Sequence, residues 1–203
     1  MDSSDIIQIM DITNLDKDKT KLQNVKQRFF ALRNGLLADQ LRKAGSPYSI
    51  IFGLNLPQLR EIAAVFGTDS ELAETLWQNK TTRESRLLAP MLADKALFTM
   101  ADVDRWISSL NGSVEEADIL CHSLLRHLPE AGEIIKELVN STVAINRYVG
   151  LRVALSKINS DPIATRCLAQ RELGQNEELT RRLALQIIDE ADFLTESEDR
   201  SGV

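Results

Sequence analysis

The sequence has few of the residues that break helices or form tight turns. Only nine glycines and five prolines occur in 203 residues, whereas leucine, alanine, glutamate and arginine, which favour helices, are plentiful. Tight turns between strands depend mainly on glycine, proline, asparagine and aspartate. The scarcity of glycine and proline therefore argues against a sheet of many strands and favours an all-α protein.

Long hydrophobic runs and cysteines are scarce too. No apolar run approaches the ~18 residues that a membrane helix needs. The first residues, MDSSDIIQIMDITNLDKDK, carry acids where a signal peptide carries lysines. We therefore expect a cytoplasmic protein with no membrane partner, in which Cys121 and Cys167 are buried thiols and not a disulfide.

Acidic residues outnumber basic ones, but the excess lies at the two ends of the chain. Residues 1–20 hold five acids and two bases, and residues 175–203 hold eight acids and three bases. Since the whole chain has 30 acids and 24 bases, residues 21–174 hold 17 acids and 19 bases, a net charge of +2. This body is much less basic than a dedicated DNA-binding protein, although a local basic groove remains compatible with it.

Hydrophobic residues recur every three or four positions along most of the chain, which is the period of a helix buried on one face. The spacing predicts a long helix from Leu22 to Lys43, and Pro57 and Gly67 mark the start and end of the next helix. Further helices are expected over 71–79, 83–94, 102–110, 114–128, 129–140, 143–158, 161–173 and 176–194.

The short links between these helices make successive helices antiparallel neighbours. A single helix of this length cannot bury its apolar face alone, so pairs of helices must stack. We therefore predict an all-α fold, a short curved solenoid (α-α superhelix) of HEAT-like antiparallel helix pairs. A compact helical bundle and a two-domain helical protein are the alternatives. The expected organisation is a partly disordered acidic leader over 1–20, one repeat domain over 21–194 and a disordered tail over 195–203.

Three segments carry spaced residues in a recognisable order. Residues 52–63 read FGLNLPQLREIA, residues 72–94 read LAETLWQNKTTRESRLLAPMLAD, and residues 103–106 read VDRW. They resemble the G-x-x-x-P-x-L-R-x-I-A, L-A-x-x-L-W…E-x-R-x-L-A-x-x-x-L-x-D and M/I-D-x-W segments of the DNA alkylation repair (AlkD-like) family. The resemblance covers residues 48–125 and implies a HEAT-like fold whose active members excise alkylated purines from DNA.

The helix after the third segment bears on that chemistry. Residues 114–118 read VEEAD, where the family typically has W-D-x-x-D. The resemblance places Asp118 at the family's catalytic carboxylate, which stabilises positive charge on the sugar as the glycosidic bond breaks. Val114 takes the position of the family's tryptophan, whose ring binds the cationic base by cation–π attraction. Valine has no such ring, and an acid that only makes hydrogen bonds between helices is the alternative role for Asp118.

Arginines on the later helices are the candidates for contact with DNA. Arg147 lies where the family has a DNA-contacting W-x-R-R segment, and Arg181 and Arg182 correspond roughly to a later helix that carries a tryptophan in the family. We predict that Arg147, Arg152, Arg181 and Arg182 line a phosphate-binding groove. Arginines that are only solvated or ion-paired are the alternative.

Other chemistries lack support in the sequence. It contains no P-loop, dinucleotide fingerprint, nucleophile elbow or metalloprotease motif. Cys121, His122 and His127 are not spaced as zinc ligands, so we predict no metal and no cofactor. Trp77 and Trp106 match positions that are structural in the family, and we expect both in the core.

Two functions follow from these observations. The first is a DNA alkylation repair-like glycosylase that excises cationic N3- or N7-alkylpurines from duplex DNA, with Asp118 stabilising positive charge on the sugar. The alternative is a non-catalytic helical-repeat module that binds DNA structures or a protein partner on its concave face. The absence of the aromatic partner at Val114 leaves open whether the chain is an enzyme.

Overall fold

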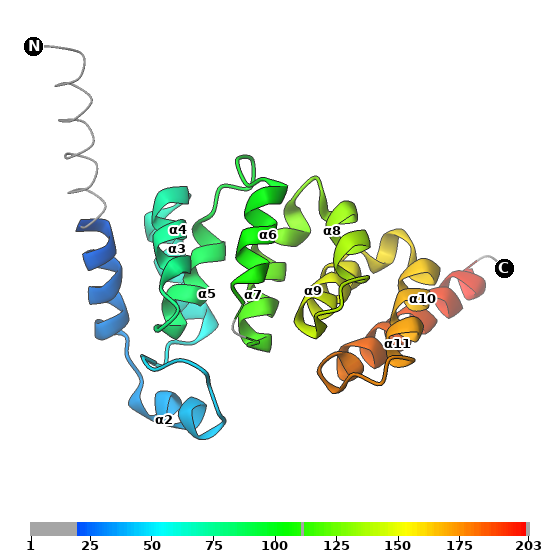
Figure 1. Ribbon diagram of the computed structural model, residues 1–203, viewed down its shortest axis with the longest axis horizontal. Helices are drawn as coiled ribbons and strands as arrows, with labels where there is room; N and C mark the ends of the chain where they lie inside the picture. The colour runs from blue at the N-terminus through cyan, green and yellow to red at the C-terminus, as the bar shows by residue number, and fades with distance from the viewer. Residues whose placement is uncertain (1–19, 111, 202–203) are drawn as a thin grey trace, which may run out of the picture. The chain divides into compact units, whose positions relative to one another are not determined.

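A computed structural model of the chain describes residues 20–110 and 112–201 (Figure 1). These residues form helices and connecting loops, with one isolated bridge between Ile50 and Thr82, which confirms the all-α prediction. None of the described helices has a stretch that is long and apolar enough to cross a membrane. Nearly all of the expected acidic leader lies outside the described residues.

Contacts within the chain divide it into two compact units, residues 1–94 and residues 95–203. We call them the N-terminal and the C-terminal unit. The expected single repeat domain over 21–194 stays a prediction.

The N-terminal unit begins with a helix over residues 20–31. It continues with α2 (Gly35–Lys43), α3 (Leu56–Phe66), α4 (Ser70–Gln78) and α5 (Arg83–Leu92). Helix α5 packs against both α3 and α4 and is buried along almost its whole length. The core between these helices includes Phe29, Leu59, Ile62, Leu72, Leu76, Leu87 and Leu88.

The predicted long helix from Leu22 to Lys43 is wrong, because the chain breaks at Asn34. There the backbone is extended, and the Asn34 side chain caps α2 by accepting a hydrogen bond from the Leu37 N–H at 3.2 Å. The Asn34 N–H donates to the Phe52 carbonyl at 2.8 Å, which satisfies the group that a continuous helix would use internally. Gly53 permits this approach, since a Cβ at Gly53 would lie 2.2 Å from the Asn34 carbonyl oxygen.

Local signals fix the next helices where the sequence places them. Asn55 and Gln58 form a reciprocal capping box at the start of α3, and Pro57 lies in its first turn. Gly67 ends α3 with a φ of 66°, a conformation that favours glycine. Asp69 then caps α4 by accepting a hydrogen bond from the Leu72 N–H at 3.0 Å.

A fully buried carboxylate fastens the loop before α3 to α5. Glu84 accepts hydrogen bonds from the backbone N–H groups of Phe52, Gly53 and Leu54 at 3.0, 2.9 and 3.3 Å. Arg83 donates both to Glu84 and to the Leu54 carbonyl, at 3.0 Å each. A buried charge is tolerated only when it is paired and hydrogen-bonded in this way.

Both tryptophans are buried, as predicted. The Trp77 ring lies under the guanidinium of the buried Arg86, 3.5 Å from its centroid, and the same arginine donates to the Trp77 carbonyl. In the C-terminal unit the Trp106 ring meets Phe98 edge-on, with 4.9 Å between centroids. Neither indole is available as a recognition surface.

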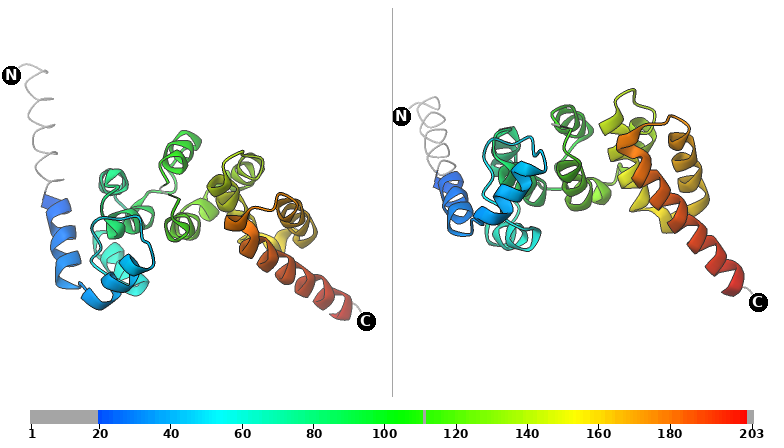
Figure 2. Two further views of the ribbon diagram at one scale, coloured as in Figure 1. Left: turned by 60° about the horizontal axis from the view of Figure 1, so that its bottom comes forward. Right: turned by 90° about the horizontal axis from the view of Figure 1, so that it is seen from below.

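The C-terminal unit is built around one central helix. It contains α6 (Met100–Ser108), α7 (Val114–Ser123), α8 (Ala131–Leu138), α9 (Ala144–Leu155), α10 (Pro162–Leu173) and α11 (Glu178–Ser201), with short 3-10 turns η1 (Leu125–His127) and η2 (Ile158–Ser160). Helix α9 packs against α7, α8, α10 and α11. Helices α10 and α11 lie side by side, as Figures 1 and 2 show.

Helix α11 extends beyond the predicted end of the repeat domain at residue 194. The Thr195 hydroxyl donates to the Ala191 carbonyl at 3.0 Å, and the Ser197 hydroxyl donates to the Leu194 carbonyl at 2.7 Å. These local bonds satisfy polar side chains that the sequence pattern associates with a disordered tail.

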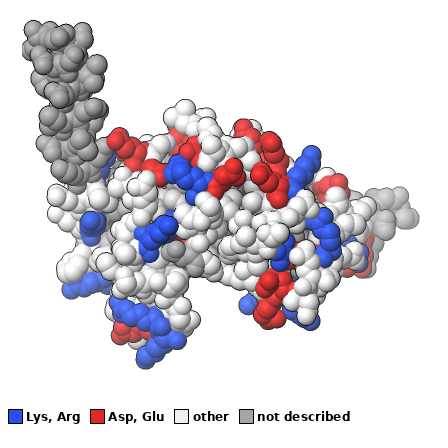
Figure 3. All heavy atoms as spheres, viewed as in Figure 1, with Lys and Arg blue, Asp and Glu red and all other residues white. Residues whose placement is uncertain are grey.

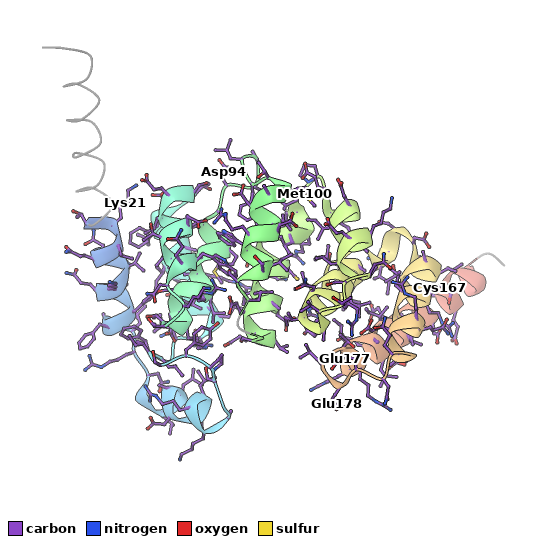
Figure 4. All side chains as sticks on the ribbon, viewed as in Figure 1. Lys21, Asp94, Met100, Cys167, Glu177 and Glu178 are labelled. Atoms are coloured by element: carbon purple, nitrogen blue, oxygen red, sulfur yellow. The ribbon has the colours of Figure 1, made fainter. Side chains whose placement is uncertain are left out.

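The two cysteines differ in exposure. Cys121 on α7 is buried as predicted, whereas the prediction that Cys167 is buried is wrong. Cys167 lies on α10 and is exposed (Figure 4). Neither forms a disulfide.

Candidate functional site

Helix α7 presents Val114 and Asp118 on one partly exposed face. Ser113 caps the helix by accepting a hydrogen bond from the Glu116 N–H at 3.4 Å. Val114 is 37% exposed, and the Asp118 side chain is 33% exposed. Since residues four apart lie one turn apart on a helix, the two side chains are neighbours, as the spacing predicts.

Two side chains of α9 converge on Asp118. One of its carboxylate oxygens, Oδ1, lies 2.8 Å from Nε of Arg152 and accepts a hydrogen bond from the Tyr148 hydroxyl at 2.9 Å. The Arg152 side chain is 32% exposed, while Tyr148 is buried at 7%. Asp118 therefore links α7 to α9, and its negative charge is paired with a cation.

Two other groups beside Asp118 are held in their neutral forms. Burial raises the pKa of the Tyr148 phenol, and the charge of Asp118 and the hydrogen bond to it raise that pKa further. Burial and the charge of Asp118 also raise the pKa of the Cys121 thiol. The Cys121 thiol donates to the Val149 carbonyl at 3.7 Å. Because its raised pKa keeps it protonated and only a thiolate attacks, this thiol is unsuited to act as a nucleophile.

Asp118 lines a hollow of about 350 Å³ between α7, α9 and α11, which we call the Asp118 hollow. Its lining residues are Val114, Asp118, Tyr148, Arg152, Leu179, Arg182, Leu183 and Gln186. The hollow combines two guanidinium groups, one carboxylate, one phenol and one carboxamide with the apolar side chains of valine and leucine. Such a set suits a phosphate or the polar edge of a base better than an uncharged apolar ligand.

The structure does not bring Arg147 to this hollow. Arg147 is 6% exposed, and its Nε lies 3.0 Å from both carboxylate oxygens of Glu172. Its Nη1 donates to the carbonyls of Ser141 and Thr142 at 3.1 and 3.2 Å. Arg147 therefore links the loop before α9 to α10, and contact between Arg147 and phosphate stays a prediction.

The other predicted arginines are exposed to different degrees. Arg181 and Arg182 both lie on the exposed side of α11, but only Arg182 is among the residues that line the hollow. Sequence reasoning missed Tyr148 and Gln186 as members of the site. Tyr148 lies four residues before Arg152, so their shared helix face was a usable signal.

Metal ligands are not clustered in the part of the chain that the structure describes. Within residues 20–110 and 112–201 there is no group of three or more His, Cys, Asp or Glu side chains that could hold a metal ion. Burial lowers the pKa of His127, and the charges of Lys95 and Arg126 lower it further. The Nε of Arg126 also donates to Nε2 of His127 at 3.1 Å, which occupies that acceptor.

Comparisons with known proteins agree with this architecture. The chain matches no curated protein. A solved structure, described as that of a new family of proteins related to the HEAT-like repeat DNA glycosylases with affinity for branched DNA structures, is similar with a TM-score of 0.57. The match covers 88% of this chain and 94% of that chain at 14% sequence identity, and it confirms the predicted HEAT-like repeat fold.

The segments at 52–63 and 72–94 are joined in the N-terminal unit by the hydrogen bond from the Gly53 N–H to Glu84, and Asp118 lies on a partly exposed helix face. The profile of the DNA alkylation repair enzyme family matches residues 25–196. The family resemblance is therefore confirmed, and the chain belongs to the DNA alkylation repair enzyme family.

Proposed function

We propose that this chain binds branched or distorted DNA through the Asp118 hollow and does not excise alkylated purines. The observation that carries the proposal is the ion pair between Asp118 and Arg152, at 2.8 Å. A carboxylate that stabilises positive charge on a sugar must present that charge to the sugar. At Asp118 the nearest cation is instead a residue of the same protein.

The charge of Arg152 acts against excision in a second way. A cationic alkylpurine placed in the hollow would lie close to this guanidinium. Two like charges at about 4 Å repel each other by about 1 kcal/mol in water and by about 4 kcal/mol near a protein surface. The hollow therefore disfavours a cationic base while it favours an anionic phosphate.

The aromatic half of the family's recognition pair is absent from the hollow. Val114 lines it without a π-face, and Tyr148 is buried with its hydroxyl bound to Asp118. A cation–π contact contributes about 0.5–2 kcal/mol to the binding of a cation. Without this contribution, we expect the hollow to bind a cationic base no more tightly than an ordinary base.

The same hollow carries the groups that a DNA backbone needs. Arg152 and Arg182 supply two guanidinium groups, and Gln186 adds a carboxamide that both donates and accepts hydrogen bonds. Affinity for branched DNA is described for the structurally similar protein, and the family match supports DNA as the ligand class here. We extend that affinity to this chain as part of the proposal.

Fluorescence anisotropy with a four-way DNA junction and a linear duplex of equal length tests the proposal. We expect tighter binding to the junction, and we expect the double variant Arg152→Gln/Arg182→Gln to lose most of it. Lys136→Gln, which removes an exposed charge on α8, is the matched control and should bind normally. Undetectable or salt-independent DNA binding by the wild type would contradict the proposal and favour a protein partner.

Excision of cationic N3- or N7-alkylpurines is the second candidate function. One observation favours it: Asp118 remains one-third exposed and lines the hollow, so it would be accessible if a phosphate drew Arg152 away. Release of N7-methylguanine from alkylated duplex DNA measures this activity directly. We expect equal background release from the wild type and from Asp118→Asn. Release by the wild type that Asp118→Asn abolishes would establish the glycosylase and overturn the first proposal.

A further inference from the structure

A groove in the N-terminal unit has the chemistry of a nucleotide site, although none of its residues belongs to the Asp118 hollow. The helix over residues 20–31 and the end of α3 border a space of about 450 Å³, which we call the Arg28 groove. Its lining residues are Asn24, Gln27, Arg28, Ala31, Val65 and Phe66. We propose that this groove holds an unpaired nucleotide of a DNA strand.

The lining offers each kind of contact that an unpaired nucleotide makes. The Arg28 guanidinium lies over the Phe66 ring, 5.8 Å from its centroid, so a cation and an aromatic ring share one wall. Such pairs provide stacking surfaces for bases, and the guanidinium also binds phosphate. Asn24 and Gln27 contribute carboxamides, whose donor and acceptor pairs match the edges of bases. Val65, 59% exposed, supplies apolar contact.

A second aromatic residue extends the surface along the helix. Phe30 is 61% exposed, and the Arg33 guanidinium lies 3.8 Å from the centroid of its ring. Since residues three apart are neighbours on a helix, Phe30 lies next to Gln27 at the margin of the groove. An exposed aromatic ring paired with arginine is a further platform on which a neighbouring base can stack.

Charge in this region favours an anionic ligand. Residues 20–38 contain four bases and no acid, and Lys21, one of the four, forms an ion pair with Asp69 at 2.7 Å. Over residues 20–94 the chain has ten bases and seven acids, a net charge of +3 in a protein whose total is −6. Figure 3 shows Lys and Arg side chains over α2, the next helix, where Arg42 is paired with Asp39 at 2.8 Å.

These features favour an unpaired strand over other ligands. In duplex DNA the faces of the bases are hidden by stacking, so aromatic platforms act on unpaired bases. A membrane surface or an apolar peptide would account for Val65 and Phe30 but not for the two carboxamides in the groove. The inference rests on the proposed DNA binding, because branched DNA offers unpaired nucleotides where its strands separate.

Binding to a duplex with a single-stranded arm of about ten nucleotides, compared with a blunt duplex of equal phosphate number, tests the inference in the full chain. We expect the wild type to bind the armed duplex about tenfold more tightly. Arg28→Gln should remove most of this preference, and Gln27→Ala should reduce it. Lys80→Gln removes an exposed charge of the same unit outside the groove and should leave the preference intact.

The outcomes separate this inference from the proposed function. Arg28 is exposed, so its variants should melt at the wild-type temperature, and Arg28→Lys tests whether the planar group is needed as well as the charge. Equal affinity for armed and blunt duplexes, with junction binding retained, would overturn only this inference. Equal losses in Arg28→Gln and Lys80→Gln would overturn it in favour of unspecific attraction. A wild type that binds no DNA would overturn both proposals.

Discussion

Arg147 and Arg152 lie on the same helix, yet they differ in burial and in the surface that they face. Both belong to α9, and both are ion-paired to a carboxylate. The Arg147 side chain is 7% exposed and its partner Glu172 4%, whereas Arg152 and Asp118 are 32% and 33% exposed. Five residues rotate a helix by about 140°, so the first arginine faces the interior and the second faces the Asp118 hollow.

We propose that exposure, more than resemblance to a motif, distinguishes Arg152, an arginine that binds DNA, from Arg147, an arginine that stabilises the fold. Glu172 also accepts a hydrogen bond from the Thr180 hydroxyl at 2.7 Å, so the Arg147 pair belongs to a polar network between α9, α10 and α11. The Arg152 pair borders solvent and has room for a third group. A phosphate can compete for Arg152 in the Asp118 hollow, whereas Arg147 lines a separate hollow beside Arg171, with its Nη2 3.8 Å from the Glu177 carboxylate.

Breaking the buried pair should have the largest effect. We expect Glu172→Ala to lower the free energy of unfolding by about 3–5 kcal/mol, because it leaves the Arg147 charge buried without its partner. Asp118→Ala, the matched change in the open pair, should cost about 1 kcal/mol or less. Urea denaturation of the two variants measures the difference. Similar losses in both would show that the two pairs are equivalent.

A conservative change at each arginine sharpens the contrast. We expect Arg147→Lys to lower the free energy of unfolding by about 2 kcal/mol, because lysine cannot reproduce the contacts to Glu172 and the loop carbonyls. Its affinity for a DNA junction should stay at the wild-type value. Arg152→Lys should keep stability and lose affinity about threefold, since the charge remains but the planar group does not. Weaker junction binding by folded Arg147→Lys would contradict this assignment.

Removing the carboxylate of the open pair should have a smaller effect, in the opposite direction. We expect Asp118→Asn to bind a junction about two- to fivefold more tightly, because it removes a charge that repels phosphate and frees Arg152. The amide can still accept the hydrogen bond from Tyr148, so the fold should tolerate the change. Anisotropy titrations at fixed salt measure the gain, and a clear loss of affinity would mean that Asp118 itself contacts the DNA.

A third ion pair, in the N-terminal unit, predicts the smallest effect. Burial alone would raise the pKa of Asp69. The carboxylate accepts hydrogen bonds from Lys21 and from the Leu72 N–H, and it is attracted by the Lys21 charge. These interactions outweigh burial, so the pKa of Asp69 is lowered. A lowered pKa means that the carboxylate stabilises the fold above its ordinary pKa and that this contribution is lost as the pH falls through the folded value. Melting temperatures should therefore fall less between about pH 5 and pH 3 in Asp69→Asn than in the wild type. Equal slopes would show that the pair contributes nothing.

Local chemistry made several helices predictable. The caps at Asn55, Asp69 and Ser113 satisfy backbone groups with side chains only a few residues away, so the sequence carries the whole signal. The break at Asn34 combines a local cap of the same kind, to the Leu37 N–H, with a hydrogen bond to the carbonyl of Phe52, which is distant in sequence. Because the hydrophobic period continues through the break, the spacing of apolar residues predicts one helix there, and only the capping residue Asn34 marks the start of α2.

Some features of the candidate site were likewise predictable from the sequence, and others depended on packing between helices. Helical spacing and the family resemblance placed Val114 and Asp118 on one face of a helix. The convergence of Tyr148 and Arg152 on Asp118 required the packing of α7 against α9. The burial of Arg147 required Glu172, which comes from α10. Contacts between helices that are distant in sequence decided which arginines are accessible, and no local pattern encodes them.

The salt dependence of junction binding tests most directly whether Arg152 is the arginine that meets DNA. The logarithm of the binding constant falls linearly with the logarithm of salt concentration, with a slope set by the number of phosphates neutralised. We predict that Arg152→Gln reduces the magnitude of this slope by about 0.9, the value for one lost phosphate contact. Lys136→Gln should leave the slope unchanged. Identical slopes in the wild type and Arg152→Gln would contradict the assignment of DNA binding to the Asp118 hollow.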